Sequence, residues 1–378
     1  MSIGTNRARR RFLLASGAAG TGLMLGGAGV WRPAHAADLT VGFIYVGPKD
    51  DFGYNQAHAE GAAAVKAMDG VLVLEEENVP ETIEVQKSME SMIALDGAGL
   101  LFPTSFGYYD PHILEVAPEY PGVNFLHCGG LYSEGDPVNA GSYFGYIDEA
   151  QYVAGIVAGH TSKTKKLGFV AAKPIPQVLR NINAFTLAAR AVDPAITTQV
   201  IFTGDWAMPV KEAEATNSLV DRGVDVVTCH VDSPKVVIET AENRGIFSSG
   251  YHANQQPLAP RGYLTGAEWN WVGVYPQFVD WHRQARLFEE ASHMYRGGLA
   301  RGLVKVSPYG EPVSDKAAEH ADQVKQALID GELVIYRGPL VDNQGNTVIP
   351  EGENYAQTDR RLEQMDWLVE GVLGSTES

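Results

Sequence analysis

Aromatic and amide side chains gather where short apolar runs of this sequence end. Tyr54 and Asn55 follow the first run, and Ser105 and Phe106 follow the third. Aromatic rings stack on flat ligands, and an asparagine side chain offers both an acceptor and donors to a polar edge. These residue types predict a site for a flat, hydrogen-bonding molecule, although Asn55 could equally serve only as a helix cap.

Later apolar runs end in a second group of the same kind. Trp206 precedes an expected helix, where it either forms a large stacking platform or packs beneath that helix. Asp232, His252 and Asn254 follow the next two runs and supply hydrogen-bonding groups, although Asp232 could be a local cap. The predicted binding site therefore draws on both halves of the chain.

A third aromatic and amide pair, Trp269 and Asn270, lies where the chain is expected to cross between two domains. We include both residues among the candidate ligand contacts. Packing at a hinge explains one of the tryptophans in this segment more simply than ligand contact does.

Catalytic motifs are absent from the sequence. It contains no GxSxG, phosphate-binding P-loop, HExxH or zinc-deaminase pattern. The adjacent carboxylates Asp50 and Asp51 are weak evidence for a metal site, because no further ligand has suitable spacing. We therefore expect a binding protein with no cofactor and no metal, and not an enzyme.

The first half of the chain alternates apolar runs with amphipathic stretches. We expect strands at residues 39–46, 71–75, 100–102 and 124–126, and helices at 56–68, 83–95 and near 113–117. Continuous apolar strands that alternate with helices are typical of a parallel sheet covered on both faces.

The same alternation then repeats. We expect strands at residues 167–171, 198–202, 224–229, 247–251, 263–265, 303–306 and 333–336, and helices at 180–192, 210–221, 233–243, 274–296 and 314–330. The fold class is therefore α/β, with two Rossmann-like, doubly wound lobes and a ligand cleft between them. We expect residues 37–145 plus about 272–305 in lobe 1, and 146–271 plus about 306–375 in lobe 2.

Residues 1–36 have the three parts of an export signal. Arg9-Arg10-Arg11 forms a twin-arginine pattern, a Gly- and Ala-rich apolar run follows, and Ala34-His35-Ala36 resembles a cleavage site. We expect export to the periplasm and cleavage after Ala36. The alternative is an uncleaved anchor, for which the run of about 17 residues is marginal.

The charge balance excludes several partners. The chain has 29 basic and 46 acidic residues, a net charge of −17. Cleavage would remove five arginines and no acid, which leaves 24 basic residues and a net charge of −22. Such a surface repels phosphate backbones and anionic lipid, so we expect no nucleic-acid partner.

Two cysteines, Cys128 and Cys229, occur about 100 residues apart at the ends of different apolar runs. An oxidising compartment would allow one disulfide. Two buried free thiols are the simpler expectation, because each cysteine falls in its own strand.

The residues at the strand ends resemble those of the basic-membrane-protein family of solute-binding proteins over about residues 38–375. The matching segments are Asp50-Asp51 with Tyr54-Asn55-Gln56, residues 148–155, 173–176, 204–209 and 365–369. This family serves ABC importers of purine nucleosides and related purines. The resemblance implies a periplasmic-binding-protein-like fold of type I that closes by a hinge.

The resemblance also implies roles for individual residues. Tyr54 and Trp206 match the two aromatics that sandwich the purine. One family acid that grips ribose is replaced by Tyr45, and another falls in the segment 252–255, which contains no acid. Loss of these carboxylates favours a free base such as adenine, hypoxanthine or guanine, with a purine nucleoside as the alternative.

The partners implied are a purine and the ABC permease of the inner membrane, and we expect a monomer. Two other classes of protein remain open at this point. An exported nucleoside-processing enzyme would need a catalytic base with a metal or nucleophile, and a sensory receptor would need a membrane kinase or chemoreceptor in place of the permease.

Overall fold

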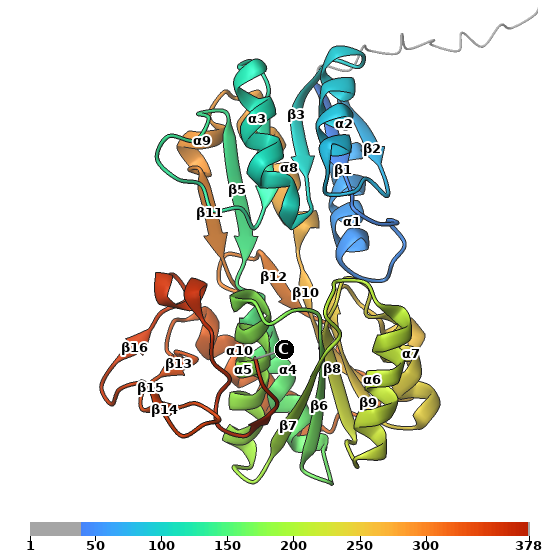
Figure 1. Ribbon diagram of the computed structural model, residues 1–378, viewed down its shortest axis with the longest axis vertical. Coiled ribbons are helices and arrows are strands. Elements are labelled where there is room, and N and C mark those ends of the chain that lie inside the picture. The colour runs from blue at the N-terminus through green and yellow to red at the C-terminus, as the bar shows by residue number, and fades with distance from the viewer. Residues whose placement is uncertain (1–38, 377–378) are drawn as a thin grey trace, which may run out of the picture. The chain divides into compact units, whose positions relative to one another are not determined.

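The computed structural model describes residues 39–376, so the expected export signal lies outside the described residues. The first of its two large sheets is entirely parallel, with the order β11-β5-β4-β3-β1-β2 (Figure 1). The elements of this lobe are β1 (Leu39–Ile44), α1 (Tyr54–Lys66), β2 (Val71–Glu76), α2 (Ile83–Ala94), β3 (Ala98–Pro103), α3 (Leu114–Val116), β4 (Asn124–Cys128), β5 (Ala140–Gly145), α8 (Trp271–Arg283), α9 (Leu287–Glu290) and β11 (Met294–Gly297).

The central strand β1 shows why this sheet is covered on both faces. Val41 and Phe43 share one buried cluster with α1 and α8, whereas Ile44 shares another with α2. Successive side chains of a strand point to opposite faces, so a continuous apolar run requires a helical layer on each side. Burial of apolar side chains on both faces therefore holds β1 in place. It also fixes the position of the sheet edge at which the strands end.

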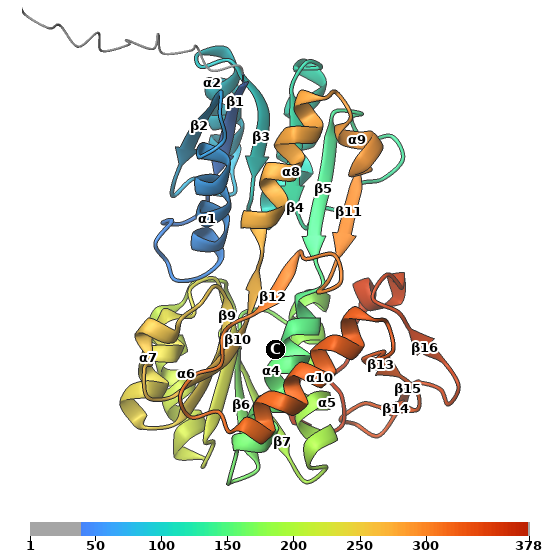
Figure 2. The same ribbon diagram turned by 180° about the vertical axis from the view of Figure 1, so that it is seen from behind.

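The second large sheet has the order β12-β10-β9-β8-β6-β7-β17, and only β12 runs antiparallel to its neighbour. Its lobe contains α4 (Ile147–Thr161), β6 (Lys166–Ala171), α5 (Pro176–Val192), β7 (Thr197–Phe202), α6 (Pro209–Asp221), β8 (Val226–His230), α7 (Lys235–Arg244), β9 (Phe247–His252), β10 (Tyr263–Trp269), β12 (Val304–Val306), α10 (Asp315–Ile329) and β17 (Val372–Leu373). Figure 2 shows α10 beside α4. Two small antiparallel sheets complete it: β13 (Tyr336–Arg337) with β16 (Asn354–Tyr355), and β14 (Leu340–Val341) with β15 (Thr347–Ile349).

The chain passes between the sheets three times, at residues 145–147, 269–271 and 297–304. These segments are bonded to one another. Tyr146 donates its backbone N–H to the Gly297 carbonyl at 2.8 Å, and Asn270 donates to the Leu303 carbonyl at 2.9 Å. We propose that the three crossovers mark the boundary between the two lobes and form their hinge. Domain closure needs a change of backbone conformation in only a few residues at the ends of elements.

The long helix expected at residues 274–296 is wrong. Helix α8 ends at Arg283, and Ala285 has a left-handed φ of 53°, which a continuing α-helix does not allow. The chain then forms the short α9 and enters β11, the edge strand of the first sheet. Tyr295 is buried in that strand. Its apolar side chain therefore belongs to the strand, although the sequence pattern assigned it to the apolar face of one long helix.

Two other expectations differ from the structure. The strand expected at residues 333–336 begins only at Tyr336, and the helix near 113–117 retains three α-helical residues between π and 3₁₀ turns. Strand β5 and helix α4 were not predicted. Both are buried along most of their length, so neither shows the polar face that marks an amphipathic element.

Cys128 and Cys229 are free and buried, as we expected, and the disulfide alternative is wrong.

Within residues 39–376, no helix is long and apolar enough to cross a bilayer.

Candidate functional site

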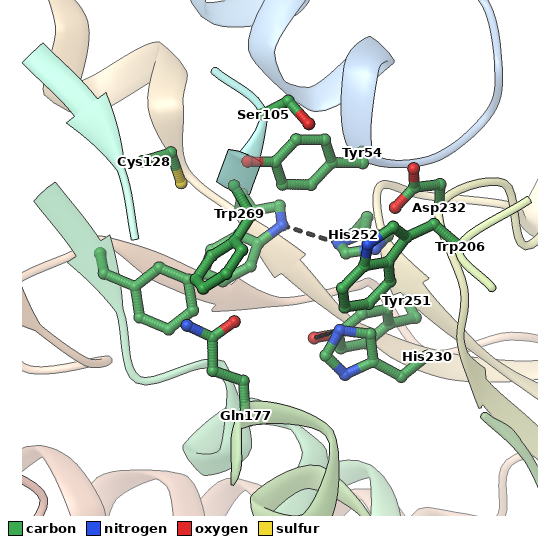
Figure 3. A pocket seen from close by; sticks show the side chains of 12 residues that line it. Tyr54, Ser105, Cys128, Gln177, Trp206, His230, Asp232, Tyr251, His252 and Trp269 are labelled. Atoms are coloured by element: carbon green, nitrogen blue, oxygen red, sulfur yellow. Dashed lines mark hydrogen bonds between the residues drawn. The ribbon is translucent and has the colours of Figure 1, made fainter. Parts of the chain in front are cut away.

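A cavity lies where strand ends of the two sheets meet (Figure 3). Seven of the ten candidate residues line it: Tyr54, Ser105, Phe106, Trp206, Asp232, His252 and Trp269. Five residues that were not predicted as ligand contacts complete the lining: Cys128, Phe144, Gln177, His230 and Tyr251. The cavity therefore has mostly aromatic walls with a few polar groups among them.

Tyr54 is the first residue of α1 in the first lobe. Its hydroxyl donates to the Thr104 carbonyl at the end of β3, at 2.5 Å, which fixes the direction of the ring. The ring meets His58 and His252 edge-on, at 4.5 and 5.4 Å between centroids. Both contacts are T-shaped, so neither histidine ring lies parallel to the Tyr54 ring.

Trp206 follows β7 in the second lobe and is half-buried. The Lys173 ammonium lies 5.3 Å from its ring centroid and also pairs with Asp205 at 2.8 Å. The Trp206 ring is tilted against His230 at 6.1 Å. Trp206 thus lines the cavity, where its indole can stack on a ligand, instead of packing wholly beneath α6.

The part of the cavity wall that we call the floor is a hydrogen-bonded cluster of second-lobe residues, namely Asn181, His230 and Tyr251. Asn181 of α5 donates to the Tyr251 hydroxyl at 2.9 Å and lies 2.9 Å from Nδ1 of His230. The rings of His230 and Tyr251 are 4.5 Å apart. Burial lowers the pKa of His230 to about 3, so this floor is uncharged at neutral pH.

His252 is held in one tautomer by Trp269. The indole Nε1–H of Trp269 donates to Nδ1 of His252 at 2.8 Å, and Figure 3 shows this bond. Burial lowers the pKa of His252 well below its ordinary value, so the ring is neutral and its proton sits on Nε2. The backbone of His252 has a left-handed φ of 71°, which is uncommon for a non-glycine residue.

Asn55, Asn254 and Asn270 do not line this cavity, and their side chains make local bonds. Asn55 donates to Asp51 at 2.9 Å, Asn254 accepts from the Gln256 N–H at 2.9 Å, and Asn270 donates to the Gly302 carbonyl at 2.8 Å. Asn55 is also not the cap of α1, since the N-cap is Gly53.

The carboxylate of Asp51 satisfies the first turn of α1 instead. It accepts from the backbone N–H groups of Gly53, Asn55 and Gln56 at 2.8 to 3.0 Å. A carboxylate at a helix N-terminus both accepts these orphan N–H groups and matches the helix dipole. Asp51 therefore positions Tyr54 by holding the start of its helix.

Comparison with known proteins assigns this chain to a family. Residues 39–338 match the family model Bmp, described as the PnrA-like substrate-binding protein of ABC transporters. The chain belongs to the Bmp family. It is therefore a substrate-binding protein that takes a small molecule and works with a membrane permease, and it is not an enzyme.

Two relatives of this Bmp protein carry names that mention a ligand. It is 35% identical to a purine-binding protein of Brucella abortus, over 93% of this chain and 96% of that one. It is 28% identical to TsgA13 of Haloferax volcanii, whose name gives it as an ABC transporter glucose-binding protein, over 92% and 83% of the two chains.

A solved structure shows the same fold. The ABC transporter solute-binding protein of Conexibacter woesei superposes with a TM-score of 0.66 at 22% identity, over 78% of this chain and 97% of that one. The α/β fold with two doubly wound lobes, as expected from the sequence, is confirmed.

The lobes of this Bmp protein touch at one edge of the cleft. Tyr54 donates its N–H to the Asp232 carbonyl at 2.8 Å, and the Ser233 hydroxyl donates to the Asp51 carbonyl at 2.6 Å. Gln255 Nε2 donates to the Phe52 carbonyl at 2.6 Å. We call these three bonds the closure seam; they join the turn before α1 to the second lobe.

Within residues 39–376, no group of three or more His, Cys, Asp or Glu side chains is placed to hold a metal ion. The cleft polar groups are instead suited to hydrogen bonding. Asp232 offers a carboxylate, Gln177 an amide and Ser105 a hydroxyl, although that hydroxyl already donates to Glu81 at 2.6 Å.

Proposed function

We propose that this protein binds a purine between Tyr54 and Trp206, and that the ligand is a free base. The observation that carries the proposal is that these two rings line one cavity from opposite lobes. The described residues include no ring contact between Tyr54 and Trp206, so neither ring covers the other. The purine-binding relative, which matches nearly the whole chain, supports the same ligand class.

The presence of one acid in the cavity lining favours a base over a nucleoside. Ribose hydroxyls are bound well by carboxylates, and Asp232 is the one carboxylate among the lining residues. Tyr45 is fully buried and its hydroxyl donates to Glu75 at 3.1 Å, so this position offers the cleft no acid. A site built from rings and few acceptors suits a flat base without a sugar.

We therefore expect adenine, hypoxanthine or guanine to bind at least about tenfold more tightly than the corresponding nucleoside, a difference of about 1.4 kcal/mol. Isothermal titration calorimetry on protein that has been unfolded, dialysed free of ligand and refolded measures both affinities. Tighter binding of the nucleoside would contradict the ribose argument while leaving the purine site in place.

A sugar is the second candidate ligand, because the relative TsgA13 carries a glucose-binding name. Aromatic faces also stack on sugar rings. The same titration should include glucose. Glucose binding without purine binding would overturn the proposal, whereas purine binding that glucose does not displace would support it.

We propose that the ligand works by stabilising the closed arrangement of the lobes, which a permease then recognises. A ligand that contacts Tyr54 in one lobe and Trp206 in the other has more contacts when the lobes are closed. This differential affinity is what shifts the population toward closure.

We also propose export to the periplasm by the twin-arginine route. Changing Arg9 and Arg10 to lysine should leave uncleaved precursor in the cytoplasm, because the route reads the arginine pair through a receptor. Cell fractionation and immunoblotting measure this, with Arg7→Lys as the matched control outside the pair. Normal maturation of the double variant would contradict the route and leave export itself standing.

A further inference from the structure

Asp232 lies between the two proposed stacking residues because its backbone is bonded to both. Its N–H donates to the Trp206 carbonyl at 2.8 Å, and its carbonyl accepts from the Tyr54 N–H at 2.8 Å. The carboxylate in turn lines the cavity, close to both rings in Figure 3. It is therefore placed at the edge of whatever stacks between Tyr54 and Trp206.

The carboxylate of Asp232 has no hydrogen-bond or ion-pair partner within residues 39–376, in contrast to the other acids around it. Glu81 accepts from Ser105 and Gly107, and Glu212 accepts from the Met208 N–H at 2.7 Å. Asp51 accepts backbone N–H groups at the start of α1 and Asp205 pairs with Lys173, as described above. Asp232 is thus the acid whose acceptor capacity is left for a ligand.

We propose that Asp232 is the specificity-determining residue of the cleft, accepting a nitrogen-bound hydrogen of the ligand as a carboxylate and releasing a proton when the ligand binds. This inference rests on the proposed purine site and adds its regulation by pH. A free purine base carries a ring N–H at the imidazole edge. The nucleoside has ribose in that place, so a carboxylate that reads the ring N–H also separates the two ligand classes.

The charges that face Asp232 explain why a proton is available for release. The carboxyl groups of Asp51, Glu81, Glu212 and Asp205 all act on it, and burial acts in the same direction. Together they raise the pKa of Asp232 to about 7, with burial the largest cause.

Neighbouring cations do not offset these acids. Lys173 is paired with Asp205, and Lys235 lies 5.5 Å from the centroid of the Phe52 ring. Burial keeps His230 and His252 neutral, because it lowers the pKa of each. The Tyr54 phenol also stays neutral, since burial raises its pKa well above the ordinary value. A donor supplied by the ligand would therefore be the main group that favours the ionised form of Asp232.

This arrangement determines the direction in which ligand affinity changes with pH. A ligand N–H lowers the pKa of Asp232, so affinity is highest above the pKa of the free protein, about 7, and declines as pH falls through that value. The decline approaches tenfold per pH unit until the lower pKa of the complex is reached. At pH 7, about half a proton should be released for each ligand bound.

Calorimetry with adenine in two buffers of different ionisation enthalpy measures this proton release directly. We expect about half a proton released at pH 7, little at about pH 8.5, and an affinity that falls on acidification from about pH 7.5 to pH 6. Proton uptake, or no proton exchange at pH 7, would overturn the inference. Because this test uses the unaltered protein, it does not depend on the folding of a variant.

Asp232→Asn keeps the side-chain shape and removes the titrating group. We expect at least about tenfold weaker adenine binding at pH 8 and no proton release. Asp50→Asn is the matched control, since Asp50 is an exposed aspartate that does not line the cavity. The inference fails if the Asp232 variant keeps the pH profile of the parent. If adenine binds without proton release and with an affinity independent of pH, only this inference is wrong. If no purine binds at any pH, the proposed function is wrong as well.

Discussion

Replacing Gly53 with alanine is expected to weaken ligand binding by about tenfold to a thousandfold. A Cβ atom at this position would lie 1.9 Å from the Asp232 carbonyl oxygen and 2.7 Å from Cδ of Pro234, both in the opposite lobe. The closure seam could not form at its present spacing. Loss of its three hydrogen bonds, at about 0.5–1.5 kcal/mol each, gives the expected range.

The measurement is the dissociation constant by calorimetry, together with the radius of gyration by small-angle scattering with and without ligand. We expect the variant to remain expanded when ligand is added. Gly122→Ala is the matched control, because a Cβ there meets no heavy atom within 4 Å. Unchanged affinity and normal compaction in Gly53→Ala would show that closure does not use this seam.

Trp206→Ala should weaken purine binding by about tenfold to a hundredfold. Removal of one aromatic face loses stacking and burial of about 1–3 kcal/mol. The fold should persist, because Trp206 is half-buried on a loop at the cavity and is not a buried core residue. The thermal midpoint without ligand should therefore change little.

Trp206→Phe is the informative companion, since it keeps a ring with a smaller face. We expect its affinity to fall between those of the parent and the alanine variant. Trp281, a tryptophan of α8 that does not line the cavity, provides the control Trp281→Phe. Parent-like purine affinity in Trp206→Ala would mean that the ligand lies elsewhere.

The strand ends were predictable because their signals are local. Tyr54 and Trp206 each follow a continuous apolar run and precede an amphipathic stretch, so the α/β rule places both at the same kind of sheet edge. Which strand ends meet across the cleft depends on the hinge, and no local pattern reports it.

Other residues of the cavity lining were not predicted, for different physical reasons. Phe144 lies in β5, whose sequence Ala-Gly-Ser-Tyr-Phe-Gly lacks a strong strand signal, and Gln177 lies in the first turn of α5 with an unremarkable polar side chain. Tyr251 was placed in its strand, but its position in the cavity lining depends on packing against His230.

The three asparagines proposed as ligand contacts make local bonds for a single reason. Asn55, Asn254 and Asn270 have the hydrogen-bonding capacity that a purine edge needs, but each bonds within a turn or crossover. Short polar side chains compete for nearby backbone and side-chain groups, so their identity alone does not separate a ligand contact from a turn. Asp232 differs because its backbone is hydrogen-bonded by its neighbours, whereas its carboxylate has no partner within residues 39–376.

The central claim, that the cleft holds a purine base, is tested most directly by identifying the ligand that the protein selects. Refolded, ligand-free protein is mixed with equimolar adenine, hypoxanthine, guanine, their nucleosides and glucose, then desalted and denatured. Mass spectrometry identifies the molecules released, and Trp206→Ala is treated in parallel. We expect a purine base at up to one molecule per protein, with much less from the variant. Release of glucose, or release of no purine from the parent protein, would contradict the account.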